Sequence, residues 1–211
     1  MEKYTVKKVI NKKDITAEAD GNIGVFVGDE ATYTSEGNIK ISGTEGIAIY
    51  SENGTAINKG KIVLAAVKED GKREGIGMIS QALEGVETTV TNMNEIESGA
   101  NLAMYIAGKG KATGENKGTI TASTGTGVYV KDNESYFDGT GGTIKVTDKG
   151  LGIYLENTSS GAVKGIGTIE LASGAVGVYG NNAKIDFEVN TSNNKGEIGV
   201  VAENKTEISK N

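Results

Sequence analysis

The chain has 211 residues and a net charge of −6, and it contains 32 glycines but no proline, cysteine or histidine. The absence of cysteine and histidine excludes disulfides, thiolate metal sites and the histidine base of most acid–base catalysis. The acidic balance argues against nucleic acid and against an anionic membrane surface as partner. Many glycines without proline favour short strands joined by tight corners, because glycine adopts positive φ whereas proline removes backbone donors from a sheet.

The first 20 residues precede the repeats described below. They lack the continuous apolar segment of a secretion signal. No later stretch approaches the ~20 apolar residues of a membrane-spanning helix, so we expect no membrane insertion by this chain. Residues 1–20 are predicted to hold an irregular N-terminal strand, within residues 4–16, that acts as a partial cap.

A four-residue pattern then recurs eight times: a mostly aliphatic residue, Gly or Ala, another aliphatic residue, and an aromatic or aliphatic residue. The copies occupy residues 23–26, 47–50, 76–79, 102–105, 126–129, 151–154, 176–179 and 198–201. Successive copies lie 22 to 29 positions apart, with a mean of about 25. So even a spacing indicates a solenoid in which each repeat forms one coil.

The remainder of each repeat also follows a pattern. Most repeats have Asn or Asp five positions after the small residue, where a sharp corner needs a residue that tolerates positive φ. A short segment around an alanine follows, and then a second alternating strand such as residues 120–122. We therefore predict an all-β fold: a parallel β-helix of about eight coils of ~25 residues, with two longer strands and one short strand per coil.

The third repeat is the longest. Its extra residues fall between Leu64 and Gly77 and include many charged side chains. Insertions in a solenoid leave the stack as loops, so we expect a protruding loop near residues 67–75. Residues 21–211 are otherwise predicted to form a single β-helix.

Strict alternation along the four-residue pattern places both aliphatic residues in the interior and the small and aromatic residues outside. The last position of the pattern forms a column of Phe26, Tyr50, Ile79, Tyr105, Tyr129, Tyr154, Tyr179 and Val201. One interpretation is structural, with rings packed over the glycines and against each other. The other is a binding strip, in which Tyr50, Tyr105, Tyr129, Tyr154 and Tyr179 receive sugar rings or a partner protein.

The corner column has two interpretations as well. It consists of Asp29, Asn53, Asp132, Asn157, Asn182 and Asn204, with Ala82 and Gly108 as exceptions. A hydrogen-bonded ladder along the corner fits the behaviour of these residue types. A row of calcium sites is the alternative, but the repeated G-G-x-G-x-D spacing of calcium-binding solenoids is missing.

Catalysis finds little support. The acidic residues are scattered, without the paired carboxylates of a glycoside hydrolase. Residues 139–146 are glycine-rich, but they lie in a strand corner and lack the following helix and the lysine of a phosphate-binding loop. We therefore expect a protein that is not an enzyme and that uses neither cofactor nor metal.

The repeats resemble a known group of proteins. GTGVYVKDN at 125–133 and GLGIYLENT at 150–158, which alternate with segments such as KGTITAS at 117–123, resemble passenger repeats of type V autotransporter adhesins of fusobacteria and their relatives. The resemblance runs from about residue 20 to the C-terminus. It implies a virulence-associated β-helix at the extracellular cell surface, held at the outer membrane through a part absent from this chain, in a parent protein that continues beyond it.

Three functions follow as expectations. The first is a non-catalytic adhesin passenger segment that displays a contact surface for a host or bacterial surface protein or glycan. The second is a β-helix that binds or cleaves polysaccharide, which a groove of close carboxylates with a basic residue would favour. The third is a pure structural spacer of a longer rod, which binds nothing itself.

Overall fold

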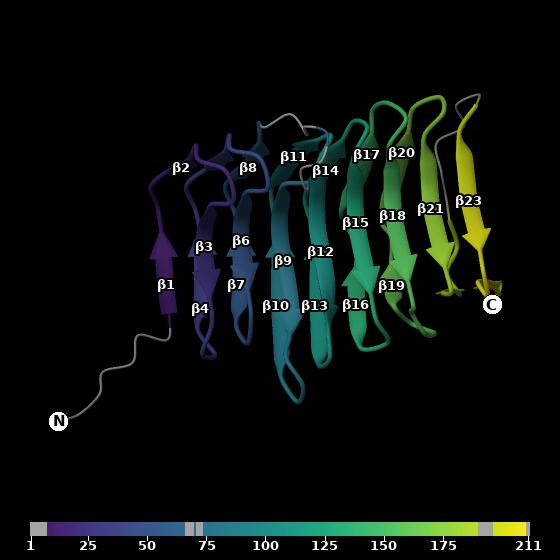
Figure 1. Ribbon diagram of the computed structural model, residues 1–211, viewed down its shortest axis with the longest axis horizontal. Helices are drawn as coiled ribbons and strands as arrows, with labels where there is room; N and C mark the ends of the chain where they lie inside the picture. Colours follow the sequence, from purple (N-terminus) through teal and green to yellow (C-terminus); the bar gives the residue numbers. More distant parts are fainter. Residues whose placement is uncertain (1–7, 66–69, 71–73, 190–195, 210–211) are drawn as a thin grey trace.

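The computed structural model describes residues 8–65, 70, 74–189 and 196–209. These residues form parallel sheets without any helix, and the chain winds through them as a β-solenoid of about eight coils. Figure 1 shows the coils side by side along the rod, from β1 near the N-terminus to β23 near the C-terminus. The predicted parallel β-helix is confirmed.

The first seven coils each contribute one strand to each of three sheets, called A, B and C here, and the last coil adds an eighth strand to sheet C. Sheet C contains β3 (Ile23–Val27), β6 (Ile47–Ser51), β9 (Ile76–Ala82), β12 (Leu102–Gly108), β15 (Thr126–Lys131), β18 (Leu151–Glu156), β21 (Val176–Asn181) and β23 (Ile198–Glu203). Sheet A contains β1 (Lys8–Asn11), β4 (Thr32–Ser35), β7 (Thr55–Asn58), β10 (Glu87–Asn92), β13 (Lys111–Asn116), β16 (Ser135–Asp138) and β19 (Val163–Gly165). Sheet B contains β2 (Ile15–Ala17), β5 (Ile39–Ile41), β8 (Lys61–Leu64), β11 (Glu95–Gly99), β14 (Thr119–Ala122), β17 (Thr143–Val146) and β20 (Thr168–Leu171). A small fourth sheet pairs β22 (Lys184–Ile185) with β24 (Glu207–Ile208).

The strand lengths refine the expected coil. Sheet C holds the longest strands, such as β9 and β12 with seven residues each. The segment around the alanine, expected to be the shortest strand, reaches six residues in β10 and β13, whereas β11, the longest strand of sheet B, has five. Ala56 and Ala112 of this segment are fully buried, whereas Thr55 and Thr113 are half-exposed, so the segment forms a third face with its own inward and outward sides.

The N-terminal residues extend two of the sheets. β1 and β2 pair in parallel register with β4 and β5, so residues 8–17 continue sheets A and B rather than forming an irregular strand. The loop predicted near residues 67–75 lies largely outside the described residues.

The interior consists of aliphatic columns that run along the stack. In the sheet B strands from β5 to β20, one isoleucine of each coil lies directly over the next and is fully buried. This column consists of Ile39, Ile62, Ile96, Ile120, Ile144 and Ile169. Burying each such side chain contributes on the order of 1.5–3 kcal/mol, and only stacking on neighbouring coils supplies the burial.

The predicted left-handed corner residues are confirmed. All six Asn and Asp residues of the corner column have φ between 51° and 74°. The exception Gly108 also has a positive φ, of 145°. Between neighbouring coils, Asn182 Nδ2 donates to Asn157 Oδ1 at 2.9 Å, as a corner ladder requires.

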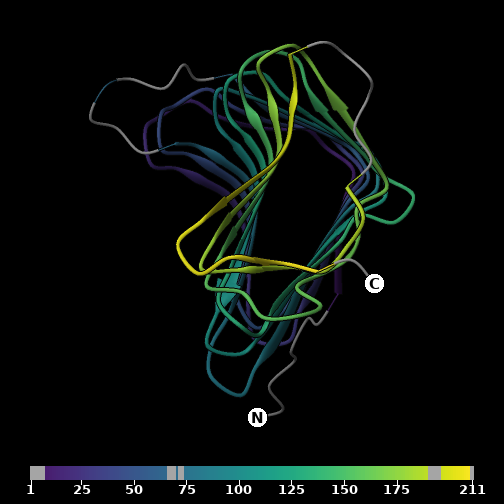
Figure 2. The same ribbon diagram turned by 90° about the vertical axis from the view of Figure 1, so that its right-hand side faces the viewer.

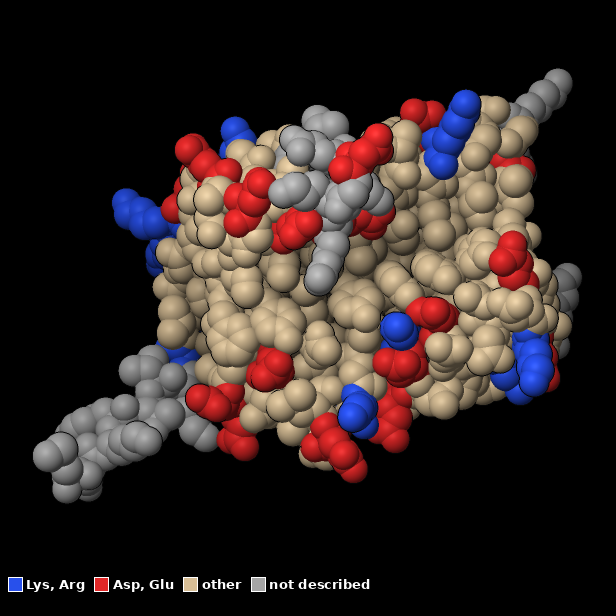
Figure 3. Space-filling view, viewed as in Figure 1, with Lys and Arg blue, Asp and Glu red and all other residues tan. Residues whose placement is uncertain are grey.

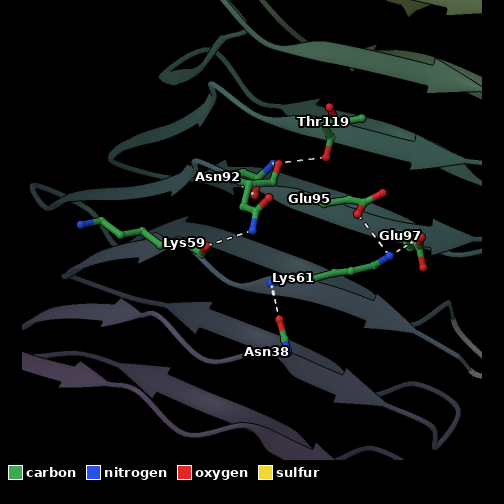
Figure 4. Close-up of polar contacts among 8 residues, drawn as sticks. Asn38, Lys59, Lys61, Asn92, Glu95, Glu97 and Thr119 are labelled. Atoms are coloured by element: carbon green, nitrogen blue, oxygen red, sulfur yellow. Dashed lines mark hydrogen bonds and ion pairs between the residues drawn. The ribbon is translucent and has the colours of Figure 1, made fainter.

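A second asparagine column is buried where sheets A and B meet. Asn58 Nδ2 donates to Asn92 Oδ1 at 3.0 Å, and Asn92 Nδ2 donates to Asn116 Oδ1 at 2.9 Å. All three residues have no exposed surface. Figure 4 shows Asn92 reaching the neighbouring coil at the carbonyl of Thr119. This ladder is not among the features predicted from the sequence.

The small residue of the four-residue pattern interrupts the alternation. In β15, both Gly127 and Val128 are buried, whereas Thr126 and Tyr129 are half-exposed. A methyl group on Gly127 would lie 2.9 Å from the Ile144 side chain, so this position faces the interior. The prediction that the small residue faces outward, and the first aliphatic residue inward, is therefore wrong.

Contact between coils limits which residue can occupy this position. The methyl group on Gly127 would also lie 2.6 Å from the carbonyl oxygen of Gly152 in the next coil, and Gly152 stands in the same relation to Gly177. This is closer than side-chain carbons approach an oxygen, so even alanine at position 127 would force its neighbours to shift. Other coils carry Ala48 and Ala103 in this column, and no larger residue occurs there. The strand bends here, and two consecutive residues point inward.

Gly127→Val should therefore destabilise the stack by about 1–3 kcal/mol through overpacking. Far-UV circular dichroism during urea unfolding would measure this. Gly199 is the matched control, because it occupies the same column at the last coil and an added methyl group meets nothing within 4 Å. Gly199→Val should change stability by less than about 0.5 kcal/mol. Equal losses in both variants would contradict the inter-coil contact.

Asn92→Ala should cost about 2–4 kcal/mol, because it removes the partner of buried polar groups on both neighbouring coils. Asn94→Ala is the control: its exposed side chain makes one hydrogen bond, to the Lys59 carbonyl at 3.0 Å. The same urea series would compare the two. A cost for Asn92→Ala no larger than that of the control would show that the buried ladder is dispensable.

Candidate functional site

The predicted tyrosine column lies in line on the outer face of sheet C. The Cα register pairs Tyr105 with Tyr129, Tyr129 with Tyr154, and Tyr154 with Tyr179. Their ring centroids are 5.2, 4.6 and 5.1 Å apart in that order. Tyr50 pairs with Phe26 at 5.4 Å, while Ile79 separates it from Tyr105. The structure therefore brings four of the five predicted residues into one ring stack and places Tyr50 in a second, shorter one.

The bend of each strand adds a second outward column. The first aliphatic residue of each pattern also faces outward, and the two columns together form what we call the apolar strip. The strip consists of Ile23, Phe26, Ile47, Tyr50, Ile76, Ile79, Leu102, Tyr105, Thr126, Tyr129, Leu151, Tyr154, Val176, Tyr179, Ile198 and Val201. None of these residues is charged.

The apolar strip is concave. Figure 2, along the rod, shows the strands of sheet C bending toward the interior near their middle. Figure 3 shows the resulting hollowed band without charged side chains, with charged residues on both sides of it. Phe26, Ile23 and Ile198 at the ends are 59%, 47% and 46% exposed, whereas Leu102 and Ile79 in the third and fourth coils are almost fully buried.

Carboxylates contact the tyrosine hydroxyls along one border of the strip. Tyr50 Oη donates to Glu52 Oε2 at 2.9 Å, and Tyr129 Oη donates to Glu156 of the next coil. Lys131 Nζ lies 3.5 Å from the same Glu156 carboxylate. Alternation could have identified Glu52, because the residue two positions after each aromatic residue lies on the same face, whereas Glu156 reaches Tyr129 from the next coil.

These contacts raise the pKa values of the phenols. Burial and the hydrogen bond to Glu52 raise the pKa of Tyr50 to about 12. The hydrogen bond to Glu203, with burial, raises the pKa of Tyr179 to about 12. Burial and Glu156 raise the pKa of Tyr129 as well. The hydroxyls are therefore neutral donors at physiological pH and hold the border carboxylates.

The ring arrangement limits what the column can bind. Tyr129 and Tyr154 are stacked at an interplanar angle of 23°, and each meets an edge-on ring on its other side, at 75° and 81°. Their faces are therefore covered by protein. A sugar ring binds an aromatic ring through its face, so the central pair offers a glycan mainly edges.

The outer faces of sheets A and B carry charged side chains, in contrast to the apolar strip. Lys61 Nζ bridges Glu95 and Glu97 of the next coil at 3.1 and 2.5 Å (Figure 4), and the pKa of Lys61 is raised, chiefly by Glu97. Lys145 pairs with Glu170 in the same way, at 3.2 Å. Their opposite charges are matched between coils, whereas the apolar strip carries no charge of its own.

Metal binding and membrane insertion are two alternative roles for this chain. Among the described residues, no group of three or more Asp and Glu residues is placed to hold a metal ion. The described part of the chain also contains no helix that is long and apolar enough to cross a membrane.

Comparison with models of protein families, with curated proteins and with solved structures found no match. The fold thus defines the class of protein, a parallel β-solenoid repeat protein.

The raised phenol pKa values predict a pH effect on stability. A phenol whose pKa is about 12 when folded and 10.0 when unfolded stabilises the fold fully below pH 10, and this contribution disappears as the pH rises toward 12. The free energy of unfolding should therefore fall more between about pH 9 and about pH 11.5 in the wild type than in the Tyr50→Phe/Tyr179→Phe variant. Urea unfolding at both pH values checks this. Equal falls would assign the effect to the lysines and the remaining tyrosines, which both proteins share.

Proposed function

We propose that the chain is a non-catalytic scaffold of an extracellular adhesin that displays the apolar strip for contact with another surface. The observation that carries the proposal is the continuity of the strip, which crosses all eight strands of sheet C without a charged residue. Contiguous apolar patches on soluble proteins commonly mark interaction sites. The resemblance of the repeats to autotransporter passengers supplies the location at the cell surface.

The alternatives are supported less well. For a polysaccharide-cleaving β-helix, the described residues offer Glu156 and Lys131 at the strip, but Glu156 already accepts from Tyr129 and pairs with Lys131. For a pure spacer, the charged side chains found on sheets A and B would suit sheet C equally well. An uncharged concave face with regularly placed aromatic rings favours contact over spacing.

The test uses binding of the purified chain to intact bacterial and host cells. The variant Tyr105→Thr/Tyr129→Thr/Tyr154→Thr removes the rings and keeps residues that favour strands. We expect binding to fall by about tenfold or more, because aromatic residues commonly dominate interface energies. Circular dichroism must show that the variant retains its β-structure.

A matched control changes the outer face of sheet B over the same part of the stack. Thr119→Ala/Thr143→Ala/Thr168→Ala alters three aligned outward residues there and should leave cell binding unchanged. Equal loss in both variants would place the contact elsewhere or indicate non-specific adhesion. Lack of binding by the wild type to any cell would overturn the proposal and favour the spacer.

A further inference from the structure

We propose that the chain associates head to tail with a second copy of itself, so that the first coil of one molecule stacks on the last coil of the other. This inference goes beyond the proposed function and concerns a different surface from the apolar strip. It is carried by three features of the end coils: open strand edges, exposed apolar side chains, and a glycine that no contact in its own molecule requires.

The end strands of sheet C each have an open edge. In this sheet β3 pairs only with β6 and β23 only with β21, and the two strands lie at opposite ends of the rod (Figure 1). Sheets A and B begin in the same way with β1 and β2, which have one strand partner each. In the described part of the chain, no further strand pairs with these edges. The backbone groups along an open edge form a template for pairing with another chain.

Exposed apolar side chains are concentrated on the end coils. Of the eight large apolar residues that are exposed among those described, four lie on the first coil and two on the last. They are Val9, Ile10, Ile23 and Phe26 on the first coil, and Ile198 and Ile208 on the last. Another coil would supply the burial that these side chains lack, as it does for their equivalents inside the stack.

An inward column of sheet C shows the same effect of position. Its members from Ile49 in β6 to Val178 in β21 are fully buried. Val25 and Val200 are the two end members of this column, and they are only half-buried. Val200 also lines an apolar hollow at the end of the rod, together with Ile185, Phe187 and Ile208. The core is therefore open to solvent at the last coil.

Gly199 in β23 indicates what covers this end. At Gly77, Gly127 and Gly152, an added methyl group would lie 2.6 Å from a carbonyl oxygen of the following coil, so a small residue is needed there. At Gly199 an added methyl group meets nothing within 4 Å. Glycine in a strand interior weakens the strand, so this residue has a cost without a benefit in the single molecule. A following coil would place a carbonyl oxygen over Gly199 and would require the small residue there too.

The first coil of a second molecule is a suitable following coil. The register of sheet C places Val25 in the same column as Val200, and Gly24 of β3 corresponds to Gly199 of β23. If β3 of a second molecule continued the sheet, its Val25 would cover Val200 at the open hollow. Because all coils share one pattern, the face that β3 leaves open resembles the faces that are covered elsewhere in the stack.

The charges along sheet C permit this contact. β3 contains no charged residue, and the only one in β23 is Glu203. In the continued register Glu203 would lie over Gly28, and Glu197 just before β23 would lie over Asn22. No carboxylate of these two strands would therefore lie opposite another, which would be unfavourable. Since the two faces in contact differ, each pair retains one free end and the assembly lengthens instead of closing.

Sedimentation velocity of the purified chain over a range of concentrations tests the inference. The wild type should form a series of oligomers that lengthen as concentration rises. Val25→Lys or Val200→Lys places a charge in the interior column at one open end, where it reaches solvent in the single molecule but is buried by a second one. Each should weaken self-association by about tenfold or more while circular dichroism stays unchanged. Gly199→Val should also weaken it, although this variant keeps the stability of the single molecule.

The matched control is Val63→Lys, which changes the charge equally. Val63 is a half-buried valine on the outer face of sheet B in β8, inside the stack. This variant should associate as the wild type does. Equal loss of association in Val63→Lys would assign the effect to net charge and overturn the inference.

Mixing the two end variants tests the direction of stacking. Val25→Lys retains an intact last coil and Val200→Lys an intact first coil. An equimolar mixture should therefore form dimers that grow no further, at concentrations where each variant alone is monomeric. A mixture that stays monomeric would contradict head-to-tail stacking.

Other results would also overturn the inference. They are a wild type that stays monomeric up to about 1 mM, a wild-type dimer that does not lengthen, and undiminished association of Gly199→Val. The cell-binding test of the apolar strip is a separate measurement, because its variants leave the end faces of sheet C intact. Failure of one proposal therefore leaves the other standing.

Discussion

Parallel pairing of each coil with the next, about 4.8 Å away, is the constraint on which the structure depends. It places each residue directly over its equivalent in the neighbouring coil, so a position is occupied favourably when its residue type packs well on itself. Ile62 and Ile96 meet this condition in the core through apolar burial. Asn58 and Asn92 meet it through hydrogen bonds between amides, and Tyr129 and Tyr154 meet it through ring stacking.

The bend in sheet C converts this regular stack into a molecule with one distinctive face. Packing between coils restricts the position of Gly127 and Gly152 to small residues, and the strand turns inward there. Two consecutive residues then point into the core. The flanking residues, such as Leu151 and Tyr154, face outward on either side of a hollow. A column of small residues inside the protein thereby shapes an apolar surface outside it.

The distribution of charge also sets sheet C apart from sheets A and B. On sheets A and B, lysine and glutamate alternate between coils and neutralise each other, as in the pairs of Lys61 and Lys145. Such exposed pairs contribute little to stability, but they leave these faces without a net preference for a partner. Along sheet C the carboxylates lie at the borders, held by tyrosine hydroxyls at Tyr50 and Tyr129. This asymmetry is the basis for regarding sheet C as the contact face.

The sequence by itself determined the solenoid, the left-handed corners and the alignment of the tyrosines, because each of these depends only on residue type and on a spacing of about 25 positions. It did not determine which side of the strand Gly127 and Thr126 occupy, since alternation alone assigns both to the wrong face. Only the tertiary structure decided this, because the carbonyl of Gly152 in another coil lies where a side chain at position 127 would have to stand. The concave shape of the strip and the contact of Glu156 with Tyr129 likewise depend on the packing of neighbouring coils, so the sequence of a single repeat does not reveal them.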